Sequence, residues 1–146
     1  MKIHQVLKQK NRLAGEVASL EAIARRENSR RSDNPSTIEC GKIFAELTKT
    51  RKLLVEIKGA IAKASAPIAE KLALLAEGKA EKTFLESLPT REGVELVTVS
   101  HGLPPERLEW KAERNRALVD ALRAAAQVRI NELQDEIDLF NAVTDI

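Results

Sequence analysis

Apolar residues recur along the first part of the chain at alternating spacings of three and four. Between residues 2 and 27 these positions are Ile3, Val6, Lys10, Leu13, Val17, Leu20 and Ala24. Such spacing places them on one face of an amphipathic helix. Lys10 alone interrupts the apolar stripe, and its aliphatic stem can cover apolar surface while its amine reaches water. The pattern therefore predicts a first helix over residues 2–27.

A second stripe of the same spacing begins near residue 40. Its members are Cys40, Ile43, Leu47, Thr50, Leu54, Ile57, Ile61, Ala64 and Ile68, continued by Lys71 and Leu75. Pro67 removes one backbone hydrogen bond and clashes with the preceding turn, but the phase of the stripe survives it. We therefore predict one helix over residues 37–88, kinked at residue 67, rather than a break with Ser65 as an N-cap. Pro89 and Gly93 end this helix.

The last third of the chain combines a β-prone segment with a third stripe. Residues 89–104 contain Val94, Leu96, Val97 and Val99, which favour a short strand or hairpin near residues 94–100. A connection of this length is either a cap over the end of the bundle or a binding loop, and capping is the better interpretation. The third stripe is Leu108, Ala112, Asn115, Val119, Leu122, Ala126, Ile130, Leu133, Ile137 and Phe140. With Pro104 and Pro105 suited to a first turn, it predicts a helix over residues 105–141.

These stripes predict an all-α protein, a long antiparallel coiled-coil bundle with a proline-kinked central helix and a short β-prone loop. At 1.5 Å per residue the three helices span about 40, 75 and 55 Å. A length of 146 residues fits one domain, residues 1–146. Its core is thin relative to its surface, so we expect a second copy to cover the exposed apolar stripes, in a homodimer or higher bundle.

Composition and charge are those of a long-helix protein, with an asymmetry between the two ends. The chain is 43% hydrophobic, 32% charged and 3% aromatic, with a net charge of +2. Residues 1–32 carry eight Lys or Arg against three Glu, a balance of +5, and residues 132–146 carry five acidic residues and no cation, a balance of −5. If the ends lie side by side their charges compensate; if they lie apart, the basic end is a candidate anion-binding surface.

The residue types that carry chemistry are scattered. His4, His101 and Cys40 are far apart in the sequence, and no pair of His stands at i, i+4, so neither a metal site nor a cofactor is expected. There is no Gly-x-Ser-x-Gly and no glycine-rich phosphate loop. We therefore predict a protein that is not an enzyme and has no catalytic, cofactor-binding or metal-binding residues.

Sequence features also predict a location. A single cysteine excludes an intrachain disulfide framework and suits a reducing compartment. The first dozen residues carry four cations and no apolar run, which predicts no signal peptide. No segment approaches the roughly 18 apolar residues of a membrane span. A cytoplasmic protein without membrane contact is expected.

Two groups of residues are candidates for contact with partners. Arg25, Arg26, Arg30 and Arg31 lie at the tip of the first helical hairpin, where they are placed to contact a phosphate backbone. The chain has no Tyr, one Trp and three Phe, none interleaved with these arginines, so base stacking is not expected there. Trp110, Val97 and Val99 are candidate interface residues. Asn115 is either a register-setting polar residue on the apolar stripe or simply exposed near a helix start.

Three runs of the sequence resemble parts of a known group of proteins. The C-terminal run Leu133–Ile146, with Ile137, Asn141, Thr144 and Asp145 in a helical finish, is similar to the ending of small bacterial and prophage proteins, some of them named septicolysin-like. The runs Ile61–Ile68 and Phe84–Gly93 are similar to the middle of such proteins. The resemblance implies an α-helical bundle of uncharacterised function. The amphipathic segments here have acidic and basic faces, so no membrane-active helix supports a toxin activity.

Taken together, the sequence favours a non-enzymatic structural or protein-interaction protein that forms a self-associating helical bundle. Its expected partners are further copies of itself and another protein that binds the end loops. The alternative is a nucleic-acid-associated helical arm that uses the basic hairpin tip.

Overall fold

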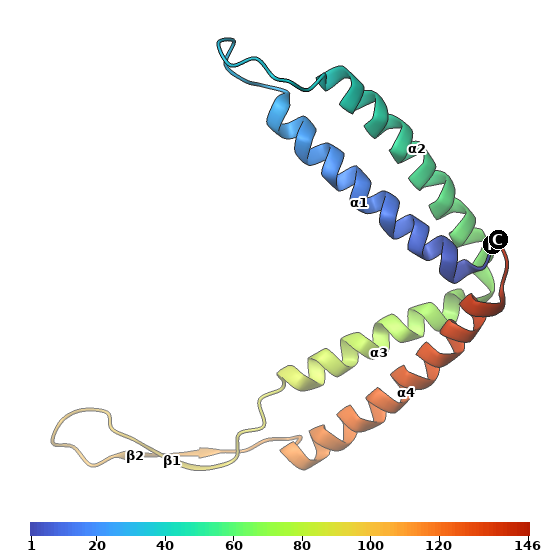
Figure 1. Ribbon diagram of the computed structural model, residues 1–146. Coiled ribbons are helices and arrows are strands. Elements are labelled where there is room, and N and C mark those ends of the chain that lie inside the picture. The colour runs from blue at the N-terminus through green and yellow to red at the C-terminus, as the bar shows by residue number, and fades with distance from the viewer. The chain divides into compact units, whose positions relative to one another are not determined.

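A computed structural model describes all residues, 1–146. The chain is mostly helical with one small sheet, as Figure 1 shows, so the broad all-α expectation is confirmed. The elements are α1 (Ile3–Glu27), α2 (Cys40–Ala64), the short 3-10 helix η1 (Ala66–Ile68), α3 (Ala69–Ser87), β1 (Gly93–Val97), β2 (Glu106–Trp110) and α4 (Arg116–Val143). They form two compact units, residues 1–69 with 138–146 and residues 70–137, which we describe separately. The expectation of a single bundle domain stays a prediction.

In the first unit, α1 and α2 lie side by side as an antiparallel helical hairpin (Figure 1). Every position of the two apolar stripes within these helices is buried or half-buried, which confirms the positions expected to face a partner. The most buried are Ile3, Val6, Leu13 and Ala24 of α1 and Leu47, Thr50 and Leu54 of α2. One ion pair crosses the helices, with Arg51 Nη2 2.7 Å from Glu21 Oε1. Regular burial at this spacing is what holds the hairpin together.

The two ends of the chain meet in the first unit. Lys2 and Asp145 form an antiparallel β-bridge, in which the amide of Ile3 donates to the carbonyl of Thr144 at 3.0 Å. The amide of Ile146 donates to the carbonyl of Met1 at 2.8 Å. Lys2 Nζ donates to Asp145 Oδ2 at 2.7 Å. Of the two arrangements considered for the charged ends, the side-by-side one therefore occurs at these outermost residues.

The ion pair at the chain ends predicts a titration. The hydrogen bond from Lys2, followed by its positive charge and that of the N-terminus, lowers the pKa of Asp145 below its ordinary value. Because the folded pKa is the lower one, the pair stabilises the fold above the unfolded pKa and loses its effect as pH falls through the folded pKa. In Lys2→Gln we expect the Asp145 pKa, followed by NMR, to rise toward the ordinary value. An unchanged pKa would contradict the ion pair between the Lys2 and Asp145 side chains.

The central helix is interrupted more strongly than predicted. We expected one helix over residues 37–88 with a kink at 67, whereas α2 begins at Cys40 and ends at Ala64. Pro67 has no amide hydrogen, so the regular bonding pattern cannot pass through it. The backbone of Ser65 opens to ψ −3°, and the amide of Ile68 donates to the carbonyl of Ser65 at 3.0 Å in a 3-10 turn. The rejected alternative, a break at Ser65, is nearer to this arrangement, although the Ser65 side chain makes no capping bond.

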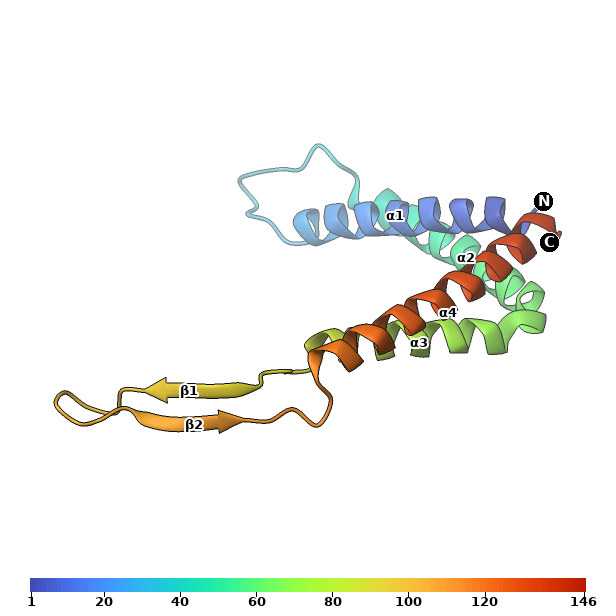
Figure 2. The same cartoon turned by 90° about the horizontal axis from the view of Figure 1, so that it is seen from below.

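In the second unit, α3 and α4 lie side by side, as the views in Figures 1 and 2 agree. Their backbones stay farther apart than those of α1 and α2. Gly78 gives one close approach, because a Cβ there would stand 3.4 Å from Ile130 Cγ1. The buried side chains are Leu75 and Leu85 of α3 with Val119, Ala126, Ile130 and Ile137 of α4. The α4 members of this set all belong to the predicted third stripe.

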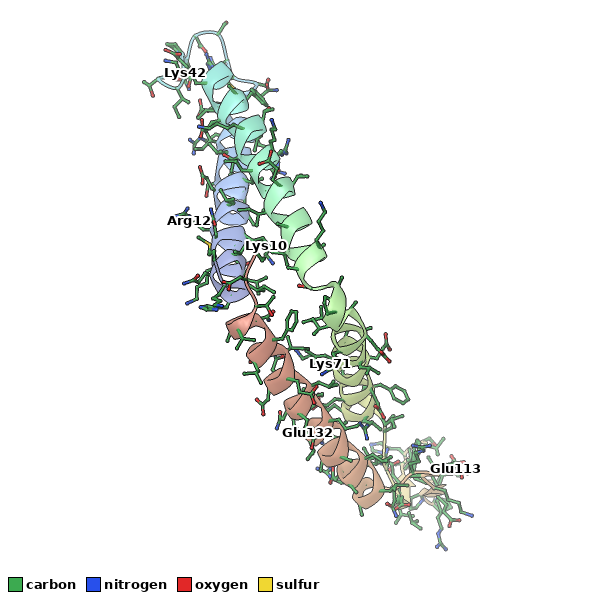
Figure 3. All side chains as sticks on the ribbon, turned by 90° about the vertical axis from the view of Figure 1, so that its right-hand side faces the viewer. Lys10, Arg12, Lys42, Lys71, Glu113 and Glu132 are labelled. Atoms are coloured by element: carbon green, nitrogen blue, oxygen red, sulfur yellow. The ribbon has the colours of Figure 1, made fainter.

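Ion pairs also cross between α3 and α4. Arg129 Nη2 lies 3.2 Å from Glu81 Oε2, and Arg123 Nη2 lies 3.3 Å from Glu86 Oε1. Lys71 pairs with a Glu136 carboxylate, and Figure 3 labels Lys71 between the two helices. These side chains are at least one-third exposed, so each pair adds little stability.

The segment before α4 corrects two predictions. Residues 106–110, expected in the last helix, form β2, and α4 begins at Arg116 instead of residue 105. β1 and β2 are antiparallel, with Gly93 opposite Trp110 and Val97 opposite Glu106. Positions 108, 112 and 115 fit helical spacing, but an isolated strand near residue 94 needs a hydrogen-bonding partner, and residues 106–110 supply it. The hairpin extends beyond the ends of α3 and α4 rather than capping them (Figures 1 and 2).

Candidate interaction surfaces

Of the four arginines predicted as an anion-binding group, Arg25 and Arg26 lie in the last turn of α1, and Arg30 and Arg31 follow in the connection to α2. We call this segment, residues 25–36, the arginine loop. Three of the arginines pair with carboxylates close in the sequence: Arg25 with Glu21 at 3.2 Å, Arg26 with Glu27 at 2.8 Å and Arg31 with Asp33 at 2.5 Å. Arg30 Nη1 donates to the carbonyl oxygen of Glu27 at 3.2 Å.

Glu27 fastens the arginine loop to the end of α1. Its Oε2 accepts a hydrogen bond of 2.6 Å from Ser36 Oγ, and its Oε1 accepts one of 2.8 Å from Arg26. Ser36 Oγ in turn accepts from the amide of Ile38 at 3.0 Å. These bonds, that from Ser36 first, lower the pKa of Glu27. The loop is thus held by a charged carboxylate, and the arginines around it remain exposed.

An aromatic residue absent from the sequence-based candidates lies beside this segment. Phe44 of α2 shares a surface groove with Arg25, Asn28 and Arg51. It is only half shielded from water, with 44% of its surface exposed. No aromatic residue is interleaved with the four arginines along the sequence, but in space Phe44 lies beside one of them, Arg25. The periodicity could have indicated this exposure, because Phe44 directly follows Ile43 of the α2 stripe and so lies off the buried face of the helix.

Trp110 stands at the base of the β-hairpin and belongs to a small polar cluster there. Its Nε1 donates to Glu95 Oε2 at 2.9 Å, and the Arg91 guanidinium carbon lies 4.5 Å from the centre of its ring. Arg91 Nη2 is also 2.6 Å from Glu95 Oε2. The bonds from Arg91 and then Trp110 lower the pKa of Glu95. Trp110, expected on the last helix, instead fixes the strands at the hairpin base.

The hairpin exposes apolar side chains on its faces and in its loop. Opposite residues of an antiparallel pair share a face, so Val94 and Leu96 lie with Glu109 and Arg107 on one face. Val94 is 51% exposed and Leu96 66%. On the other face Val97 and Leu108 are half-buried. The hairpin loop adds the exposed residues Val99 and Leu103. Of the predicted interface residues, Val97, Val99 and Trp110 therefore lie in one projecting element.

Asn115 occupies the N-terminus of α4 rather than the buried stripe. Its Oδ1 accepts a hydrogen bond of 2.9 Å from the amide of Leu118, and the carbonyl of Asn115 accepts from the amide of Val119 at 3.0 Å. This is an N-cap, which satisfies an amide that has no partner inside the helix. The simpler of the two sequence interpretations, an exposed residue near a helix start, agrees with its exposure.

The cap predicts a stability change. Asn115→Ala should lower the free energy of unfolding by about 1 kcal/mol, measured in urea by circular dichroism. Asn115→Asp supplies an oxygen at the same place and should keep most of the stability. Equal losses in both variants would contradict the capping role.

The other chemically competent residues are not brought together. No group of three His, Cys, Asp or Glu side chains is placed to hold a metal ion. Cys40 is a half-buried free thiol at the start of α2, and His4 and His101 are exposed. The groove between α3 and α4 is lined by Leu74 and Leu133 with a rim of glutamates. None of the helices has the length and apolar character needed to cross a membrane.

Comparison with known proteins gives no relative from which to transfer a role. No family model, no curated protein and no solved structure matches this chain.

Proposed function

We propose that this chain is a non-enzymatic structural and protein-interaction protein that self-associates. The observation that carries the proposal is the projecting hairpin, which exposes several large apolar side chains to water. They are Val94, Leu96, Val99, Leu103 and Trp110. A projecting element so rich in exposed apolar side chains is typical of a surface that contacts another protein. Burying it against a second molecule removes that surface from water.

A second surface supports the same proposal. Helix α4 carries an exposed stripe at spacings of three and four, besides the stripe it buries. Its members are Leu118, Ala121, Ala125 and Val128. In a two-helix hairpin, α3 can cover only one of the two apolar stripes of α4, so the other stays exposed to solvent. The small alanines in the exposed stripe permit close approach of another helix. This stripe is suited to coiled-coil packing of another helix along α4.

Self-association is tested by the mass in solution. The monomer is 16.2 kDa, and light scattering on the full chain at tens of micromolar should give twice this mass or more. The mass should fall toward that of the monomer on dilution. A monomer mass at all concentrations would remove the proposal.

The cytoplasmic location and the kinship with septicolysin-like proteins belong to the same proposal. What supports them is the sequence: a single cysteine, which suits a reducing compartment, and the similar C-terminal finish at residues 133–146.

The alternative is a nucleic-acid-associated arm that uses Arg25, Arg26, Arg30 and Arg31. The groove that Phe44 shares with Arg25 favours it, because an exposed aromatic ring beside guanidinium groups offers a base both stacking and phosphate contacts. The ion pairs with local carboxylates do not prevent this, since exposed pairs are weak and exchange readily.

Binding measurements across a salt series test the alternative. Affinity for single strands should fall steeply with salt, and replacing the four arginines by Ser should abolish it. Replacing four exposed lysines elsewhere, namely Lys52, Lys58, Lys63 and Lys79, by Ser removes the same charge and should leave most of the binding. Phe44→Ala should weaken single-strand binding more than duplex binding. Absence of binding at low salt would exclude this function.

A further inference from the structure

The small sheet has two free edges. It contains only β1 and β2, so the outer edge of each strand has no strand beside it. A two-stranded hairpin alone is marginally stable in water, and three or more strands are usually needed. Exposed edges are also templates for strands of other chains, which add to them through backbone hydrogen bonds. The hairpin is therefore suited to extension by a further strand.

The order of charges along β2 distinguishes between the possible strands. Arg107 and Glu109 lie on one face, two residues apart, with Leu108 between them on the other. Neither charged side chain has a hydrogen bond or ion pair within the chain. In an antiparallel pair of two β2 strands centred on Leu108, Arg107 lies opposite the second copy's Glu109, and Glu109 lies opposite the second copy's Arg107. Unlike charges placed opposite each other stabilise a sheet.

Pairings of β2 centred one residue away, and pairings through the free edge of β1, do not place unlike charges opposite each other. A pairing centred on Arg107 sets two arginines opposite each other, and one centred on Glu109 sets two glutamates opposite each other, which is destabilising. β1 has a single charged residue, Glu95, so no register of β1 against itself forms a cross-strand ion pair. A two-fold axis through Leu108 is thus the arrangement for which the β2 edge complements itself.

We propose that two copies of this chain join through their β2 edges, antiparallel about Leu108, into a four-stranded sheet ordered β1-β2-β2-β1. The inference rests on the proposed self-association and names one surface for it, separate from the exposed stripe of α4. One face of the sheet carries Val94 and Leu96 of each copy beside the central ion pairs, and the other carries Leu108 of each copy at its centre. The new sheet has the strand number that gives independent stability.

Charge reversal tests the pairing. Arg107→Glu sets carboxylates against the second copy's Glu109, and Glu109→Arg sets guanidiniums against the second copy's Arg107, so each variant alone should dimerise at least ten-fold more weakly than the natural chain. An equal mixture of the two variants should restore dimerisation, because each chain then meets unlike charges. Analytical ultracentrifugation with one variant fluorescently labelled measures the mixed dimer. A role of these residues in folding alone would not produce recovery on mixing.

The outcomes separate this inference from the function on which it rests. Weak single variants with recovery in the mixture support the β2 pairing. A natural chain that dimerises, with both variants dimerising equally well, overturns the β2 pairing but leaves self-association in place. Weak single variants without recovery also overturn it. A natural chain that stays monomeric overturns both.

Discussion

Replacing Leu54 by alanine is expected to lower the free energy of unfolding by about 2–5 kcal/mol. Leu54 lies in the middle of α2, is 9% exposed and belongs to the stripe that packs against α1. The truncation removes buried methyl groups and leaves a cavity that a helical hairpin cannot fully close. Urea unfolding followed at 222 nm measures the loss.

The next residue along α2 provides the matched control. Val55 is 68% exposed, so Val55→Ala should change the unfolding free energy by less than about 0.5 kcal/mol. Similar losses at the two positions would mean that the stripe does not define the buried face of α2.

Replacing Gly15 and Gly59 together by alanine is expected to raise the free energy of unfolding by about 1–2 kcal/mol. Both glycines lie inside long helices, where glycine is less favourable than alanine because it loses more conformational freedom on folding. A Cβ at either position would meet nothing within 4 Å, so no clash offsets the gain. The two single variants should add, because they do not share neighbours.

A glycine outside the helices tests the reason for that gain. Gly102, in the hairpin loop, has φ +88°, a conformation that alanine adopts only with strain. Gly102→Ala should therefore fail to stabilise the protein. A gain at Gly102 equal to that at Gly15 or Gly59 would contradict the helix-based explanation.

Periodicity predicted the buried positions well and the ends of elements poorly. Leu13, Leu47 and Ile130, one from each predicted stripe, are buried as their local spacing predicts, because a side chain's face follows directly from its position in a helix. The strand at residues 106–110 could not be found in this way, because Leu108 fits a helical stripe and a strand equally. Its pairing with β1 is a contact between separated segments, which no local pattern encodes.

The same distinction applies to the candidate surfaces. The arginines of the arginine loop are visible in the sequence as a cluster, because they are close neighbours along the chain. The bond from Ser36 to Glu27 and the place of Phe44 beside Arg25 arise from the return of the chain after the loop. The sequence made Trp110 a candidate interface residue, but its contacts with Arg91 and Glu95 depend on the strand register.

The bridge between the chain ends has a consequence for the order of folding. Lys2 and Asp145 are separated by 143 positions in the sequence, whereas Arg51 and Glu21, which join α1 to α2, are separated by 30. Closing a longer loop costs more chain entropy before any contact compensates for it, so short-range pairings form sooner. We therefore expect the helical hairpins to form early and the bridge late, and substitutions at Lys2 to speed unfolding while leaving the folding rate nearly unchanged.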